Sequence, residues 1–185
     1  NLRNLEELLD KNTNTLVSLM HANNEIGNLI CLEKVNKLCL KYNALFHSDT
    51  VQTIGHIPIN VKTNPLDFLT CSAHKLHGPK GIGFLYIKDS VNITPLIHGG
   101  SQEKNMRGGT EYLHGIVGLA KAMEIACKNM EEDKKHILNL KSRMIFKLKQ
   151  EIPEIYFNGK SEDLEDSLYT ILNISLPNQD YADLL

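Results

Sequence analysis

The stretch LTCSAHKLHGPKGIG, residues 69–83, places a lysine where an apolar run ends and a glycine-rich turn begins. Residues 69–73 have the composition of a buried strand, and His74 and Lys75 follow directly. A lysine at the end of a buried strand loses hydration, and we expect this loss to lower its pKa. A neutral amine attacks carbonyl groups and can form a Schiff base. The stretch therefore favours Lys75 as a nucleophile for an aldehyde, against the commoner alternative of a solvated surface lysine.

A carboxylate and an amide stand three residues apart in a second motif, HSDTVQ. A buried carboxylate such as Asp49 needs a partner, which can be an ion pair, a cap or the protonated nitrogen of a pyridine ring. Gln52 can donate a hydrogen bond to the phenolate oxygen of such a ring. Ser72 and His74 can hold a phosphate beside Lys75. Together these groups match the chemistry of pyridoxal 5'-phosphate (PLP).

Short apolar runs predict the strands that would position these residues. Residues 15–20 and 44–49 are two such runs, and the segment 31–43 between them has apolar residues at helical spacing. A strand, a helix and a strand in this order indicate a βαβ unit with parallel strands. Two further strands are expected at 66–73 and 83–89. Continuous apolar strands favour a sheet covered on both faces, and the predicted class is α/β.

Polar residues follow three of these predicted strands. In an open parallel sheet, ligands bind beyond the carboxyl ends of the strands. The first strand leads into HANNEIG, the second into SDTVQ and the third into SAHK. We expect one rim of the sheet to gather Asn24, Glu25, Asp49, Gln52, Ser72, His74 and Lys75.

The last third of the chain has a different pattern. Residues 111–152 predict one long helix without a proline, and strands are expected at 155–159 and 169–176. We therefore expect two domains: an α/β domain at 1–130, and the incomplete start of a smaller α+β domain at 131–185. Because helical patterns occur at both ends of the chain, including the final DYADLL, we also expect an internal fragment.

Composition limits the possible functions. The 185 residues carry a formal net charge of −2, which gives no basic field for nucleic acid. No apolar run reaches the roughly 18–20 residues of a membrane-spanning helix. No HExxH motif is present, so no metal site is predicted. The four cysteines form no CxxC pair, and we expect small buried hydrophobic residues in a reducing compartment. They are Cys31, Cys39, Cys71 and Cys127.

The motifs HANNEIG, HSDTVQ, SAHKLHGPKGIGFLYI, HGGSQEKNMRGGTE and GIVGLAKA closely resemble those of the NifS/IscS-type cysteine desulfurases in order and spacing. The resemblance spans nearly the whole chain. These are class V, fold-type I PLP enzymes, so it implies part of the PLP-dependent transferase fold. That fold has a mainly parallel sheet covered by helices, followed by a smaller α+β C-terminal domain. Residues 1–130 would be the C-terminal half of the large PLP-binding domain.

The resemblance also implies a role for each residue of the predicted site. Lys75 is similar to the lysine that binds the PLP aldehyde and moves the substrate's α-proton. Asp49 resembles the residue that pairs with the pyridine nitrogen, and Gln52 the residue that bonds the ring oxygen. Asn24 resembles the asparagine near the ring oxygen and the substrate.

Three further residues are carried over in the same way. Ser72 and His74 resemble phosphate ligands. Thr110, in RGGT, resembles the threonine that reaches the phosphate of the neighbouring subunit's cofactor, which implies a homodimer. The family's loop usually reads Arg-Ser-Gly-Thr, so Gly108 stands where a serine is usual.

For the intact protein, the resemblance implies removal of sulfur from L-cysteine, which leaves L-alanine and an enzyme-bound persulfide. The persulfide would pass to an acceptor such as an iron–sulfur scaffold protein, and the expected location is cytoplasmic. The family's catalytic cysteine and substrate arginine are expected beyond residue 185, and none of the four cysteines matches that cysteine. We therefore expect the chain alone to lack desulfurase activity and tight PLP binding.

Two kinds of alternative stay open at this stage. Within the family, the alternatives are a selenocysteine lyase and another class V aminotransferase. Outside catalysis, the alternative is a truncated homologue that acts as a dimerisation or acceptor-binding module.

Overall fold

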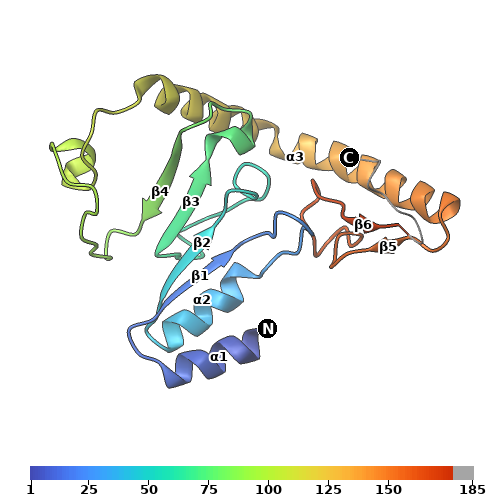
Figure 1. The fold of residues 1–185 in the computed structure, drawn as a ribbon, viewed down its shortest axis with the longest axis horizontal. Coiled ribbons are helices and arrows are strands. Elements are labelled where there is room, and N and C mark those ends of the chain that lie inside the picture. Colours follow the sequence, from blue (N-terminus) through green and yellow to red (C-terminus); the bar gives the residue numbers. More distant parts are fainter. Residues whose placement is uncertain (177–185) are drawn as a thin grey trace.

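The computed structural model describes residues 1–176 of the chain (Figure 1). Its elements, in chain order, are α1 (Leu2–Lys11), β1 (Leu16–Met20), α2 (Leu32–Lys41), β2 (Leu45–Asp49), β3 (Phe68–Ser72), the 3-10 helix η1 (Ala73–Leu76), β4 (Gly83–Ile87), the 3-10 helix η2 (Gln102–Asn105), α3 (Leu113–Glu151), β5 (Tyr156–Phe157) and β6 (Ile174–Ser175).

The main sheet has the strand order β1-β2-β3-β4. Strands β1, β2 and β3 run parallel, and β4 runs antiparallel to β3. Helix α2 connects β1 to β2, so the predicted βαβ unit is confirmed. All four strands predicted for this part are present, and the fold is α/β with a mainly parallel sheet.

One face of the sheet is buried beneath helices. Val17, Phe46 and Cys71 point into the same apolar cluster as Val35 and Cys39 of α2. Apolar residues of α1 and α3 complete this cluster. Burial of these side chains stabilises the α/β part by removing apolar surface from water.

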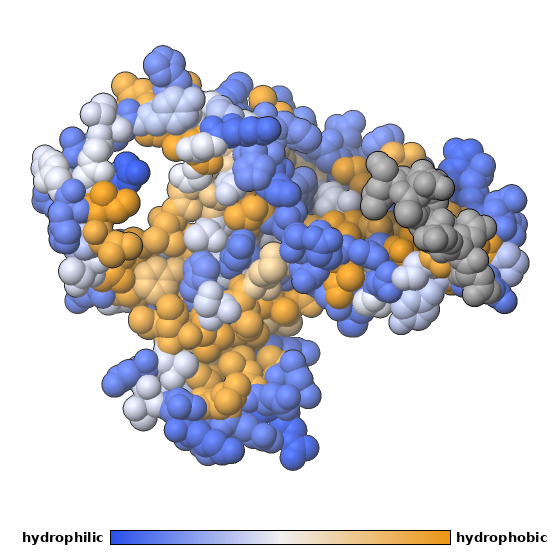
Figure 2. Space-filling model, in the orientation of Figure 1, coloured by the Kyte–Doolittle hydropathy of each residue, from blue (hydrophilic) through white to orange (hydrophobic). Residues whose placement is uncertain are grey.

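The opposite face of the sheet is exposed in the chain. Leu16 is 55% exposed, Leu45 is 40% exposed and Leu85 is 48% exposed. The prediction that helices cover both faces is therefore wrong for residues 1–176, because their helices pack on one face. Figure 2 shows apolar residues gathered on the surface over the region of the sheet.

Helix α3 joins two apolar clusters. Its Leu119 is buried in the cluster of the main sheet, and its Ile137 and Leu138 pack against a second cluster of Ala22, Leu168 and Tyr169. The helix runs unbroken through 39 residues, as predicted. In the described part of the chain, no helix combines the length and apolar character needed to cross a membrane.

The second sheet is much shorter than predicted. Strand β5 has two residues, and the left-handed φ of 61° at Gly159 lies just beyond it. Strand β6 also has two residues instead of the expected 169–176. The preceding residues form a turn in which the Ile171 amide donates to the Leu168 carbonyl, which is incompatible with an extended strand. The helical turn expected at 180–185 lies outside the described residues.

All four cysteines were predicted to be buried, and this is confirmed for two of them and wrong for the other two. Cys39 and Cys71 are buried, and burial raises the pKa of each thiol to about 11. Cys31 and Cys127 are exposed. Cys31 precedes the first turn of α2, where the chain leaves the core. Cys127 lines an open apolar groove of about 340 Å³ beside α3.

Candidate active site

The parallel strands align their carboxyl ends. Met20 of β1 pairs with Asp49 of β2, and Asp49 pairs with Thr70 of β3. The polar loops that follow these strands therefore start from one row of the sheet. This alignment brings the loops carrying Asn24, Gln52 and Lys75 to the same rim, as the sequence predicted.

Asp49 is half-buried at the end of β2, and its backbone is fixed from both sides. The His21 amide donates to the Asp49 carbonyl at 2.8 Å. The next residue, Thr50, donates to the Thr70 carbonyl through both its amide (3.2 Å) and its hydroxyl (2.7 Å). The Val51 amide donates to Asp49 Oδ1 at 2.9 Å, and it is the carboxylate's only hydrogen-bond partner among the described residues. Oδ2 can thus serve a ligand.

A turn presents His74 and Lys75 to solvent. Strand β3 ends at Ser72, and η1 follows with Ala73 and Leu76 buried while His74 and Lys75 are exposed. The Ala73 carbonyl accepts the Gly78 amide at 2.9 Å, which closes the turn.

The backbone of this turn depends on glycine. A Cβ on Gly78 would lie 3.0 Å from the Ala73 oxygen, so the close approach of the two segments needs a residue without a side chain. The residue before it, His77, has a left-handed φ of 60°. The glycine-rich sequence after Lys75 therefore turns the chain sharply, as predicted.

The predicted desolvation of Lys75 is wrong for this chain. The side chain is exposed, because it leaves the end of β3 on the outer side of η1. The buried residue of the strand end is Ala73 instead. Residues 1–176 therefore do not enclose the Lys75 side chain.

A loop of residues 21–30, which we call the Asn24 loop, follows β1. Asn23 Oδ1 accepts the amides of Glu25 and Ile26, each at 2.9 Å, and the Gly27 amide donates to the Asn23 carbonyl at 3.0 Å. The exposed Asn24 donates from Nδ2 to Glu25 at 2.9 Å. These bonds form a compact turn that carries Asn24 at its tip.

Thr110 belongs to a different part of the molecule. It is exposed on the connection between β4 and α3, which arches away from the sheet in Figure 1. The strand ends that gather the other predicted residues do not carry Thr110. Its expected role toward a neighbouring subunit's cofactor stays a prediction.

Sequence reasoning missed the polar residues that hold these loops together. His21 Nδ1 lies 2.8 Å from Thr53 Oγ1 in a buried hydrogen bond. His56 Nδ1 lies 3.2 Å from the Tyr169 hydroxyl, and the two rings meet edge to face. Burial is the main cause that lowers the pKa of His56, while an interaction with the backbone of Lys75 acts in the opposite direction. The sequence signal for these residues was weak, because their partners lie up to 113 positions away.

The residues at the rim fit PLP by their chemistry. The protonated nitrogen of the PLP ring pairs with a carboxylate, and Oδ2 of Asp49 is available for this contact. The ring oxygen calls for a donor such as the Gln52 amide, and the aldehyde for an amine such as that of Lys75. Hydroxyl and imidazole groups suited to a phosphate are present in Ser72 and His74.

Comparison with known proteins identifies the family. The model of the aminotransferase class-V family matches residues 1–185. The chain therefore belongs to the aminotransferase class-V family.

Curated relatives show which members of this family the chain is similar to. The chain is 46% identical over 155 residues to the cysteine desulfurase IscS of Dictyoglomus turgidum and 48% identical over 160 residues to that of Clostridium botulinum. These matches cover 84% and 86% of this chain, but 39% and 40% of the relatives. The chain thus spans about two-fifths of the length of these relatives, in agreement with the expectation of a fragment.

Solved structures show the same fold. A NifS-like protein from Rickettsia africae superposes with a TM-score of 0.91 at 38% identity, over 99% of this chain and 50% of that one. The structure described as SspA in complex with cysteine superposes with a TM-score of 0.74 at 31% identity, over 96% of this chain and 48% of that one. The α/β fold is therefore that of NifS-like proteins.

Proposed function

We propose that the intact protein is a PLP-dependent cysteine desulfurase. It would convert L-cysteine to L-alanine and hold the sulfur as an enzyme-bound persulfide. The observation that carries this proposal is the alignment of the ends of β1, β2 and β3, which lead into the segments with Asn24, Gln52 and Lys75, in a sheet like that of a NifS-like protein. The curated relatives described as cysteine desulfurases support it.

The residues of the rim have distinct proposed tasks. When bound, PLP supplies the electron withdrawal that the bond changes at L-cysteine require. Asp49 would hold a proton on the ring nitrogen, because Val51 engages only its Oδ1. Gln52 would donate to the ring oxygen. Lys75 would bind the aldehyde and, once released by the substrate's amine, would move the proton at the substrate Cα.

The phosphate and the substrate would be held by the neighbouring turns. Ser72 and His74 lie on either side of the step from β3 to η1, where they would bind the phosphate. Asn24 would face the ring oxygen and the substrate from the tip of its loop. The partner subunit's cofactor would be reached by Thr110, so we also propose a homodimer.

The thiol that takes the sulfur would come from residues outside this chain. Cys39 and Cys71 are buried with raised pKa values, so neither is a ready thiolate. Cys31 and Cys127 do not match the position of the family's catalytic cysteine. The persulfide would then pass to an acceptor such as an iron–sulfur scaffold protein, in the cytoplasm.

The division of the chain into domains is also a proposal. We place the end of the large domain at residue 130 and the start of the small domain at residue 131. This boundary falls within the continuous helix α3. It lies between Leu119, in the first apolar cluster, and Ile137, at the second.

The proposed reaction can be tested on the full-length protein. The protein is incubated with L-cysteine and a thiol reductant, and alanine and sulfide are measured. Equal amounts of the two products are expected. Release of selenide from L-selenocysteine with no turnover of L-cysteine would favour a selenocysteine lyase, and transfer of the amino group to a keto acid would favour an aminotransferase. Absence of all three reactions with PLP bound would contradict the enzyme class.

A further inference from the structure

The segment of residues 158–173, which we call the C-terminal segment, folds back onto the Asn24 loop. The Leu168 amide donates to the Gly27 carbonyl at 2.8 Å. The Lys160 amide donates to Asn28 Oδ1 at 2.6 Å. In the middle of the loop, Asn173 Nδ2 donates to the Glu25 carbonyl at 3.1 Å. The Leu29 amide also donates to the Asp166 carbonyl at 3.5 Å, so bonds to residues far along the chain hold the loop at four points.

The two segments approach each other without room for extra atoms. A Cβ on Gly159 would lie 2.6 Å from Asn28 Oδ1 and 2.7 Å from Ile26 Cδ1. A Cβ on Gly27 would lie 3.2 Å from Ile171 Cβ. Close packing of this kind transmits a displacement of one segment to the other.

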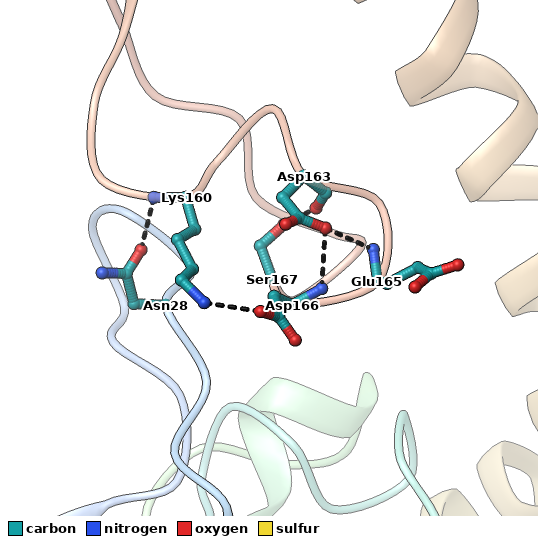
Figure 3. A network of polar contacts seen from close by, with 6 residues as sticks. All are labelled: Asn28, Lys160, Asp163, Glu165, Asp166 and Ser167. Atoms are coloured by element: carbon teal, nitrogen blue, oxygen red, sulfur yellow. Dashed lines mark hydrogen bonds and ion pairs between the residues drawn. The ribbon is translucent and has the colours of Figure 1, made fainter.

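The C-terminal segment is itself braced by polar contacts. Figure 3 shows the Asp163 carboxylate accepting the Asp166 amide, and Lys160 Nζ paired with Asp166. The Ser167 hydroxyl donates to the Asp163 carbonyl. The same figure shows Asn28 reaching the Lys160 amide from the Asn24 loop.

A buried lysine attaches this braced segment to α3. Lys141 is 5% exposed, and its Nζ donates to Ser167 Oγ at 2.8 Å and to the Leu168 carbonyl at 3.2 Å. Leu168 is the residue whose amide bonds the Asn24 loop. A chain of direct contacts therefore leads from α3, through the C-terminal segment, to the Asn24 loop.

We propose that the C-terminal segment sets the position of the Asn24 loop, and that Asn28 is the positioning residue that couples the two. Among the described residues, the exposed Asn24 side chain bonds only to Glu25 of its own loop, so the backbone of the loop decides where its amide points. Asn28 Oδ1 is the acceptor that joins this backbone to Lys160. The assignment of Asn24 to the cofactor and substrate rests on the proposed function, whereas the coupling rests on the contacts alone.

The test uses three variants of the full-length protein. Asn28→Ala removes the acceptor for the Lys160 amide. Asn28→Asp keeps a side-chain oxygen at that place. Lys160→Ala is the matched control, because it removes the exposed ion pair with Asp166 and leaves the Lys160 amide in place.

Hydrogen exchange gives a readout that does not depend on activity. In PLP-free protein, the amides of residues 21–30 should exchange about tenfold faster in Asn28→Ala than in wild type. They should stay within about twofold of wild type in Asn28→Asp and Lys160→Ala. Equal exchange in Asn28→Ala and Lys160→Ala would overturn the coupling, whether or not the protein proves to be a desulfurase.

Kinetics and spectroscopy test the consequence for the site. In the PLP-loaded enzyme, Asn28→Ala should raise KM for L-cysteine about tenfold with a smaller change in kcat, and should shift the visible absorbance of the bound cofactor. Asn28→Asp should restore both. Wild-type KM and absorbance in Asn28→Ala would overturn the positioning role. An inactive wild-type enzyme would instead contradict the proposed function.

A second variant covers the case in which Asn28→Ala does not fold. Asn173→Asp keeps the Oδ1 that accepts from Asn158 Nδ2, and removes only the donor to the Glu25 carbonyl. It should speed exchange in residues 21–30 and raise KM in the same direction. Unchanged exchange in this variant would overturn the proposal by itself.

Discussion

His21 Nδ1 lies 2.8 Å from Thr53 Oγ1, in a buried hydrogen bond between the end of β1 and the turn that carries Gln52. The backbone of the same histidine donates to the Asp49 carbonyl. One side chain and its backbone thus tie the Asn24 loop, Asp49 and the Gln52 turn together. The residue has no proposed contact with substrate, and its role is to hold the rim in shape.

The buried state of His21 predicts a pH-dependent stability. Burial lowers its pKa from 6.5 to about 4 in the folded protein. The unfolded chain takes up a proton on this histidine near pH 6.5, whereas the folded chain does so only near pH 4. The contribution of neutral His21 to the free energy of unfolding is therefore complete above pH 6.5 and is lost as the pH falls toward 4. Urea unfolding between pH 7 and 4 should show a loss of up to about 3 kcal/mol from this residue.

Two histidine variants isolate this effect. His21→Gln should weaken the pH dependence between 6.5 and 4, because it removes the share of His21, while His56, whose pKa burial also lowers, still contributes. His136→Gln, on the exposed surface of α3, should keep the wild-type dependence. An unaltered pH profile in His21→Gln would show that the prediction is wrong.

Substitution of Lys75 should abolish the proposed chemistry without loss of the fold. Lys75→Ala removes the amine that would bind the aldehyde, so kcat should fall by about 10³-fold or more. Because the side chain is exposed, the free energy of unfolding should change by less than about 0.5 kcal/mol. Steady-state kinetics and urea unfolding measure the two effects, with the exposed Lys80→Ala as control. Retention of more than a tenth of wild-type kcat in Lys75→Ala would contradict the assignment.

Lys141 should be important for stability, although lysines on helix surfaces seldom are. Burial lowers its pKa, and two acceptors of the C-terminal segment receive its hydrogen bonds. Lys141→Ala removes both hydrogen bonds, so Ser167 Oγ loses a donor and the Leu168 carbonyl keeps only the Ile171 amide, and the change should cost about 2 kcal/mol. Thermal unfolding of Lys141→Ala should be compared with Lys135→Ala, an exposed lysine on the same helix. Equal Tm values for the two variants would count against this role.

The buried thiols should be inert in the folded protein. Cys39 and Cys71 have pKa values of about 11 and little exposure, so neither forms a thiolate readily at pH 7. Brief treatment with iodoacetamide, followed by mass mapping, should leave both unmodified until the protein is unfolded. After turnover with L-cysteine, neither should carry persulfide sulfur. A persulfide on Cys39 or Cys71 would contradict the proposal that the thiol that takes the sulfur lies outside this chain.

The sequence predicted the main sheet and α3 well, because local patterns encode both. The strands at Leu16–Met20 and Leu45–Asp49 are short apolar runs, and α3 has regular apolar spacing. The row that joins Met20, Asp49 and Thr70 follows from the geometry of parallel strands. The alignment of the strand ends could therefore be predicted from the sequence, while the roles of the residues that follow them stay predictions.

Long-range contacts account for what the sequence did not predict. The position of Asn28 depends on Lys160, 132 residues later, and no local pattern links the two. The strand expected at 169–176 is shortened to Ile174–Ser175, because the preceding residues form a turn closed by the Ile171 amide and the Leu168 carbonyl. The exposure of Lys75 depends on how η1 leaves the strand, which composition alone does not encode.

Reduction of the PLP-loaded, full-length protein with borohydride tests the proposed PLP site most directly. Borohydride fixes the bond between PLP and its lysine, and digestion with mass mapping then finds the modified peptide. The pyridoxyl mass should be on Lys75, with one adduct per chain. A pyridoxyl group on another lysine, or no adduct after addition of PLP, would contradict the proposed site.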